Sequence, residues 1–206
     1  MTDAWKRKIR IAAGYIIKNI VNKIKFNLSN FRFIRNNLTL ESAKVYFDTM
    51  IMSHMSYCVT SWASACKTTL KPIQTVYKQT LKVQDKKPKT YHHCQILKKH
   101  ERLSWDNTVK HTNAILIYKI FHGKAPPPLQ EFVKKNSNRS TRAGSRGDCV
   151  VPFRKSAFSQ TTFSVRASHT CNSIPHTIRE LPTLTSFTKC LKAWLLEEQH
   201  CCHNPA

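Results

Sequence analysis

The lysines between residues 71 and 87 form the clearest candidate binding feature of this sequence. Lys71, Lys78 and Lys82 are seven and four residues apart, so on a helix they share one face. Lys86 and Lys87 follow directly. Ammonium groups in such a row can contact successive phosphates of a nucleic acid and release its condensed counterions. The row therefore predicts a phosphate-binding face, with a merely solvated helix face as the simpler alternative.

A second basic group occurs further along the chain, within residues that are rich in Ser, Asn and Arg. It comprises Arg142, Arg146, Arg154 and Lys155. Guanidinium groups can bind phosphate through two parallel hydrogen bonds. A disordered basic loop is an equally good interpretation of this group, so the sequence leaves both interpretations open here.

The overall charge favours nucleic acid as the partner. The 206 residues contain 34 Lys and Arg against 11 Asp and Glu, a formal net charge of +23, yet 41% of them are hydrophobic. A strongly basic chain that can build a core is typical of a nucleic-acid-binding protein, and next of a protein that rests on anionic membrane. The longest apolar run, residues 11–17, is too short to cross a bilayer. We expect an intracellular protein, nuclear or cytoplasmic, with reduced cysteines.

The histidines and cysteines do not form a recognisable catalytic or metal-binding motif. His92, His93 and Cys94 are adjacent, and residues 200–203 read His-Cys-Cys-His, but neither group has the spacing of a zinc site. His54 and Cys58 are four residues apart on an expected apolar helix face, which favours core positions. The sequence also lacks the glycine motifs of nucleotide-binding folds. It thus predicts no catalytic residue, no metal, no cofactor and no small-molecule substrate, with a weak zinc-binding module as an alternative.

The hydrophobic pattern predicts a mainly α-helical protein. The first helix, residues 5–35, has an expected apolar stripe through Ala13, Ile16 and Ile20. A second helix begins after Thr39 as its N-cap and reaches Trp62. We expect an N-terminal three-helix bundle, then a smaller mixed α/β module with one β-hairpin, formed by residues 149–153 and 161–165. The expected further helices span residues 69–87, 103–123, 129–134 and 186–198, and the expected domains span residues 1–90, 91–135 and 136–206.

Three long strings, taken in this order, resemble the C-terminal part of the reverse transcriptases of animal non-LTR (LINE-type) retrotransposons. They are residues 37–82 (NLTLESAKVYFDTMIMSHMSYCVTSWASACKTTLKPIQTVYKQTLK), residues 97–133 (LKKHERLSWDNTVKHTNAILIYKIFHGKAPPPLQEFV) and residues 141–181 (TRAGSRGDCVVPFRKSAFSQTTFSVRASHTCNSIPHTIREL). The resemblance implies that the first string is a polymerase thumb, which grips the template–primer duplex. Part of that string also resembles the AlkB-homologue N-terminal domain family, but no His-x-Asp or His-x-Glu pair supports dioxygenase chemistry.

The resemblance implies a binding function without catalysis. Polymerisation uses two metal ions held by palm carboxylates, and this chain has no adjacent Asp pair. We therefore expect a non-enzymatic remnant that binds RNA or an RNA–DNA duplex, with a full-length polymerase as a further partner. The alternative is a fragment that packs on a missing palm domain. The family also has Trp where this chain has Cys171, which implies a looser core at that position.

Overall fold

The computed structural model describes residues 3–136 and 147–199, and side chains from Ile11 onward except Ala157 and Phe158. The described chain is mainly helical, as the hydrophobic pattern predicts. It forms two compact units, one reaching Trp105 and the other spanning Asp106–Gln199. The first unit extends beyond the expected domain end at residue 90, because α6 packs on α5 and the Trp105 ring stacks on Trp62 at 5.6 Å.

The first unit contains three helical segments around one core. Its largest fully buried side chains include Phe31, Phe47 and Leu81, one from each segment. The elements are α1 (Asp3–Ile34), the 3-10 turn η1 (Arg35–Asn37), α2 (Leu40–Tyr46), the π-helix η2 (Phe47–Met52), α3 (Ser53–Ser56), α4 (Val59–Trp62), α5 (Lys67–Gln84) and α6 (His93–Lys99).

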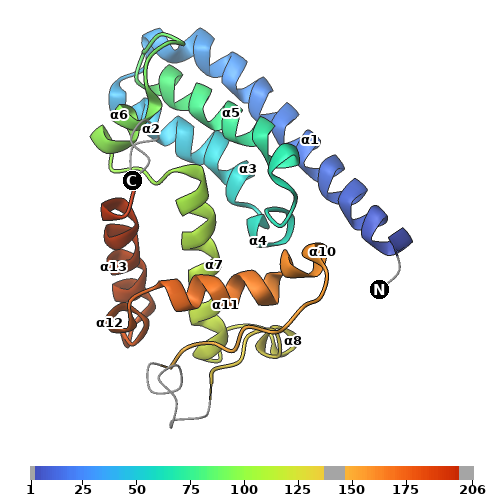
Figure 1. Ribbon diagram of the computed structural model, residues 1–206. Coiled ribbons are helices and arrows are strands. Elements are labelled where there is room, and N and C mark those ends of the chain that lie inside the picture. The colour runs from blue at the N-terminus through green and yellow to red at the C-terminus, as the bar shows by residue number, and fades with distance from the viewer. Residues whose placement is uncertain (1–2, 137–146, 200–206) are drawn as a thin grey trace. The chain divides into compact units, whose positions relative to one another are not determined.

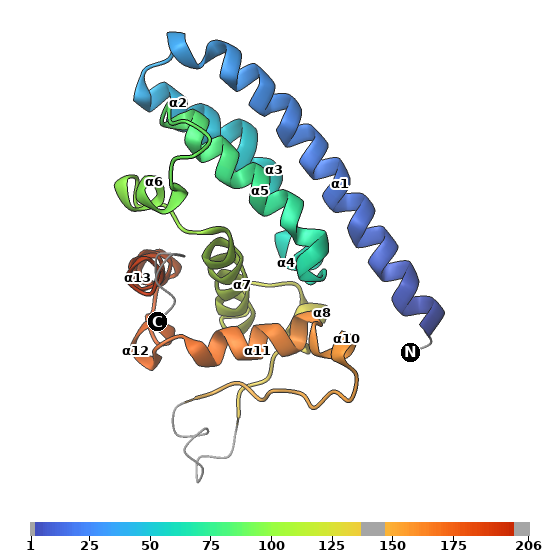
Figure 2. The ribbon, with the colours of Figure 1, turned by 45° about the horizontal axis from the view of Figure 1, so that its top comes forward.

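Helices α1 and α5 lie side by side and run in the same direction (Figures 1 and 2). Buried residues on α1 alternate at spacings of four and three, which keeps one stripe against its neighbours; they are Ile17, Val21, Ile24, Leu28 and Phe31. The expected stripe is wrong at Ile16, which is exposed, because Ile17 takes the buried position instead. Buried Arg35, the next position of the stripe, donates from Nε to the Gln84 carbonyl at 2.8 Å, which joins the end of α1 to the end of α5.

The π-helix η2 changes which residues of the second segment face the core. The buried residues Ala43, Phe47, Ile51, Met55 and Val59 are spaced by four throughout, whereas a regular α-helix would alternate spacings of four and three. His54 is therefore only half-buried, and Cys58 is exposed at φ 48°, so their expected core positions are wrong. Buried Asn27 donates to the Met50 carbonyl at 2.7 Å and so satisfies a carbonyl within the π-helix.

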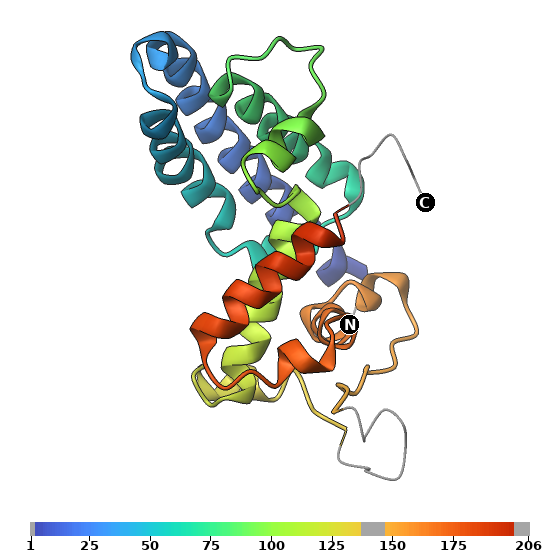
Figure 3. The same ribbon diagram turned by 90° about the vertical axis from the view of Figure 1, so that its left-hand side faces the viewer.

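The second unit is built on α7, whose first residue, Trp105, belongs to the first unit. Helix α13 lies alongside α7 (Figures 1 and 3), where the Tyr118 and Phe187 rings stack at 4.5 Å. Gly123, at φ 66°, ends α7 as expected, because Lys124 N–H donates to the Lys119 carbonyl at 2.8 Å in a Schellman motif. The elements are α7 (Trp105–Phe121), α8 (Pro127–Gln130), α10 (Ala157–Gln160), α11 (Phe163–Ser173), α12 (His176–Arg179) and α13 (Leu184–Glu197).

The predicted β-hairpin is wrong for the described residues. Residues 149–153 are extended, but Cys149 forms an isolated antiparallel bridge with Lys135 instead. Residues 161–165 become a turn and the start of α11. The β-favouring Thr, Phe and Val there are overridden by packing, since Val165, Ser168 and Cys171 are buried at helical spacing.

Gln84 generates a stability prediction. Its side chain is fully buried, and neither amide atom has a hydrogen-bond partner among the described residues. A buried polar group without a partner loses its hydration and gains nothing in return. Gln84→Met should therefore raise the free energy of unfolding by about 1–3 kcal/mol, measured by urea denaturation. Exposed Gln79 on the same helix is the control. Gln79→Met should change the free energy of unfolding by less than about 0.5 kcal/mol. A loss of stability for Gln84→Met would show that the amide has a partner.

Candidate nucleic-acid interface

A groove in the first unit, the basic groove, gathers five cationic side chains. It lies between the C-terminal part of α1, the second half of α5 and the turn that follows α5. None of the described residues lining it is acidic. They are Arg32, Thr75, Lys78, Gln79, Lys82, Val83, Lys87, Pro88 and Lys89. An anionic ligand would therefore meet only attraction from its immediate walls.

The packing of α1 on α5 positions three of these cations. Arg32 is exposed and directly follows Phe31, which is fully buried in the core. On α5, Tyr77 and Leu81 are buried, so Lys78 and Lys82 emerge one turn apart at the edge of the core. The buried apolar residues thus fix the backbone positions of the cationic residues, whose side chains extend from there into the groove.

The turn after α5 brings two further cations to the same place. Lys86 adopts φ 51°, and Lys87 N–H donates to the Lys82 carbonyl at 2.8 Å, as in a Schellman motif. The Lys82 ammonium donates to the Lys89 carbonyl, and the Lys87 ammonium lies 4.9 Å from the centroid of the Tyr91 ring. These contacts fold the turn back onto α5. The negative end of the α5 dipole also favours cations here.

The structure brings together three of the five predicted lysines. Lys78, Lys82 and Lys87 line the groove. Lys71 is exposed on the same face of α5 but about 16 Å from Lys82 along the helix axis. Lys86 is also exposed and does not line the groove.

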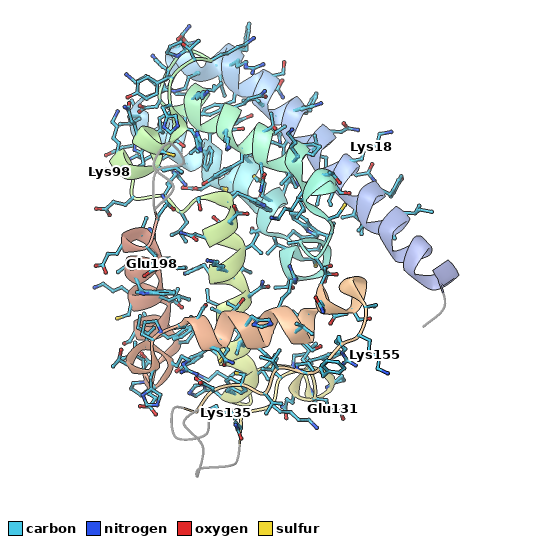
Figure 4. All side chains as sticks on the ribbon, in the orientation of Figure 1. Lys18, Lys98, Glu131, Lys135, Lys155 and Glu198 are labelled. Atoms are coloured by element: carbon cyan, nitrogen blue, oxygen red, sulfur yellow. The ribbon has the colours of Figure 1, made fainter. Side chains whose placement is uncertain are left out.

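Two groove cations were missed by the sequence reasoning, which singled out neither Arg32 nor Lys89. A signal for Arg32 was present, because it continues the exposed positions Lys18 and Lys25 at a spacing of seven, one residue after Ile17, Ile24 and Phe31. Figure 4 shows Lys18 on the exposed side of α1.

The structure describes only part of the second predicted basic group. Arg142 and Arg146 lie outside the described residues. Arg154 and Lys155 are exposed in the segment before α10, where Figure 4 shows Lys155. Arg154 and Lys134 line a hollow that also contains Glu131 and the half-exposed Phe132. The acidic side chain makes this hollow a weaker anion site than the basic groove.

One cluster of metal-ligating residues occurs among those that the structure describes. One ligand atom from each of His92, His93 and Cys94 lies within 4.8 Å of the others, and the Cys94 sulfur is 3.8 Å from His93 Nε2. The cluster lies at the N-terminus of α6, where the helix dipole disfavours a cation. The three side chains can supply three ligand atoms, so a zinc site at this end of the helix stays an alternative.

Other candidate side chains serve the core or are isolated. Trp105 and Tyr118 are buried, so they are not platforms for base stacking. The exposed Cys66 accepts hydrogen bonds from Thr68 and Thr69 at the start of α5, which lower the pKa of its thiol to about 7. Cys66 is therefore the readily ionised exposed thiol of this unit.

Comparisons with protein-family models, with curated proteins and with solved structures find no match for this chain. Within the described residues, none of the helices has the length and apolar character needed to span a bilayer. The groove and its charges therefore carry the functional argument.

Asp85 fastens α6 to the end of α5, immediately beside the basic groove. Its carboxylate accepts from the Lys99 ammonium at 2.8 Å and lies 3.0 Å from His100 Nε2. The side chains of Asp85 and His100 are both 3% exposed. Burial alone would raise the pKa of Asp85, but the hydrogen bonds and charges of Lys99 and His100 outweigh it and lower the pKa below its ordinary value of 3.8.

Asp85→Asn should lower the free energy of unfolding at pH 7 by about 2 kcal/mol, because it removes a charge-assisted hydrogen bond and leaves His100 buried. A carboxyl group whose pKa is lowered by folding stabilises the fold at a pH above its ordinary pKa. This stabilisation is lost as the pH falls through the pKa of the folded state. The difference from wild type should therefore shrink below about pH 4. Urea denaturation at pH 7, 5 and 3 measures it, with exposed Glu198→Gln as the control. A difference that does not depend on pH would contradict the assignment.

Proposed function

We propose that this protein binds RNA–DNA or RNA duplexes without catalysis, by holding backbone phosphates in the basic groove. The observation that supports this best is the convergence of five cations from α1, α5 and the following turn, with no acidic residue in the described lining. Phosphate contacts position a protein on a duplex without reading its bases. The binding should thus be largely independent of sequence and strongly dependent on salt.

The proposal includes an origin in the thumb and adjoining region of a non-LTR retrotransposon reverse transcriptase. The resemblance of the three strings supports it, and a helical unit that presents cations to a duplex is consistent with a thumb. Three aspartates of the described residues support a non-catalytic role. Asp48 pairs with Arg102 at 2.6 Å, Asp85 with Lys99 and Asp148 with Arg179 at 2.9 Å. These carboxylates are thus engaged by cations instead of being held ready for metal ions.

Neutralising the groove tests the proposal. Arg32→Gln, Lys78→Gln and Lys87→Gln together remove three groove charges and keep the Lys82–Lys89 contact. The control variant, Lys110→Gln, Lys124→Gln and Lys189→Gln, removes three exposed charges from the second unit. Binding to a fluorescent RNA–DNA hybrid is titrated between 50 and 200 mM salt. The slope of log affinity against log salt should become less steep by about 2–3 for the groove variant.

For the control variant, this slope should stay near that of wild type. Equal losses in both variants, or binding of wild type that ignores salt, would refute the groove.

A specific observation also favours the alternative of a fragment that packs on a missing domain. Helix α1 exposes apolar side chains on the side opposite its buried stripe. Tyr15, Phe26 and Phe33 are 67%, 68% and 87% exposed, and Ile11 precedes them on the same side. Exposed aromatic side chains of this size mark surfaces that a partner covers. The face could therefore contact another part of a full-length polymerase.

If that face belongs to an absent partner, replacing Tyr15, Phe26 and Phe33 by Ser should reduce self-association of the isolated chain, because less apolar surface is exposed. The melting temperature should change by no more than about 2 °C, since these side chains add little to the core. Sedimentation velocity and thermal unfolding measure the two effects. A large drop in melting temperature would show that the side chains stabilise this chain itself. Unchanged hybrid binding would separate this face from the groove.

A further inference from the structure

Two buried cysteines of the second unit form a thiol pair. Cys149 lies in the extended segment before α10, and Cys171 lies in α11; each is 4% exposed. The Cys149 thiol donates a hydrogen bond to the Cys171 sulfur. The two sulfur atoms therefore lie within hydrogen-bonding reach of each other, and both residues belong to one buried cluster.

Neighbouring side chains hold the backbone of Cys149 in place beside α11. The Asn172 amide accepts from Cys149 N–H at 2.7 Å and donates to the Cys149 carbonyl at 3.0 Å. Ser168 Oγ donates to the Val150 carbonyl at 2.9 Å. Three hydrogen bonds from one helix thus fix the segment that carries one thiol against the helix that carries the other.

The surroundings of the two thiols are electrostatically unequal. The hydrogen bond from Cys149 lowers the pKa of Cys171, and burial opposes this effect. The charge and hydrogen bond of Arg179 and the charge of Lys135 lower it further. Arg179 is itself fixed, because it donates to Asp148 at 2.9 Å and to the Gly147 carbonyl at 3.2 Å. The pKa of the Cys149 thiol is raised, first by its hydrogen bond to Cys171 and then by burial. One sulfur can thus ionise while the other keeps its proton.

Cys171 also lines a cavity of about 70 Å³. Ile117, Phe121 and Phe187 supply apolar walls, and Lys135 and Arg179 supply the cations. The cavity is large enough for a molecule somewhat bigger than water. A small neutral oxidant such as a hydroperoxide can therefore reach Cys171, the more readily ionised sulfur of the pair.

We propose that Cys149 and Cys171 form a site of oxidation by hydrogen peroxide. The Cys171 thiolate attacks one peroxide oxygen, the O–O bond breaks, and the departing hydroxide takes a proton to become water. The resulting sulfenic acid is attacked by the Cys149 sulfur, which loses its proton. An S–S bond forms, and the sulfenic hydroxyl leaves as a second water. The two thiols together lose two electrons, and the peroxide gains them.

A purely structural role for the two cysteines, as small apolar residues of the core, makes the opposite prediction. Buried thiols without cationic neighbours are inert towards oxidants. The fixed position of Arg179 beside Cys171 and the adjacent cavity are what distinguish this pair from ordinary core cysteines. The proposal does not depend on nucleic-acid binding.

Peptide mapping of the whole chain tests the site. The protein is treated with a few equivalents of hydrogen peroxide, alkylated, denatured and digested with trypsin without reductant. Cleavage after Arg146, Arg154, Arg166 and Arg179 places the two cysteines in separate peptides, 147–154 and 167–179. These two peptides should become covalently linked in most molecules and separate again with dithiothreitol. Exposed Cys66, whose thiol pKa is about 7, shows that oxidant was active. Oxidised Cys66 alongside alkylated Cys149 and Cys171 would overturn the proposal.

Substitutions assign the two roles. In Cys149→Ser, Cys171 should stop at the sulfenic acid and give a dimedone adduct on peptide 167–179. In Cys171→Ser, peptide 147–154 should carry no adduct. Arg179→Gln should slow linkage about tenfold, while Cys190→Ser, which removes an exposed thiol, should leave the rate unchanged. Far-UV circular dichroism confirms folding of each variant. An adduct on Cys149 in Cys171→Ser, or linkage at the wild-type rate in Arg179→Gln, would contradict the assigned roles.

Discussion

The parallel packing of α1 on α5 is the constraint on which the first unit depends. The buried stripe of α1 fixes the distance and rotation of the two helices, and Arg35 joins their ends through the Gln84 carbonyl. Arg32 and Lys82 can line the same groove only because these helices end together. A shift of one turn along either helix would move one set of cations about 5.4 Å past the other.

The same arrangement concentrates positive charge, which costs free energy in the unliganded protein. The C-terminal dipole of α5 and the Lys82–Lys89 contact offset part of this repulsion. The Asp85 carboxylate offsets a further part of the repulsion, and it contacts Lys99 on α6 and His100, the C-cap of α6. The remaining charge is what a polyphosphate ligand would neutralise. Stability and binding are therefore expected to be coupled, with the folded unit gaining from the ligand.

Sequence reasoning succeeded where one local rule determines the outcome. The shared face of Lys78 and Lys82 follows from helical spacing, the Thr39 N-cap accepts from Ser42 N–H, and Gly123 ends α7. It failed where packing overrides the local rule. With the π-helix in place, Met55 and Val59 are buried where His54 and Cys58 were expected. Helix α11 forms where a strand was expected. Lys86 ends α5 in a conformation that favours glycine. Arg32 lines the same groove as Lys82, which is 50 residues away in the sequence, and no pattern along one helix reveals such a neighbour.

Lysine footprinting measures whether nucleic acid occupies the basic groove. The protein is acetylated under limiting reagent with and without an RNA–DNA hybrid, and each lysine is quantified by mass spectrometry. The hybrid should protect Lys78, Lys87 and Lys89 several-fold and leave exposed Lys124 and Lys189 unchanged. Uniform protection of all lysines, or protection centred on Lys134 and Lys155, would contradict it.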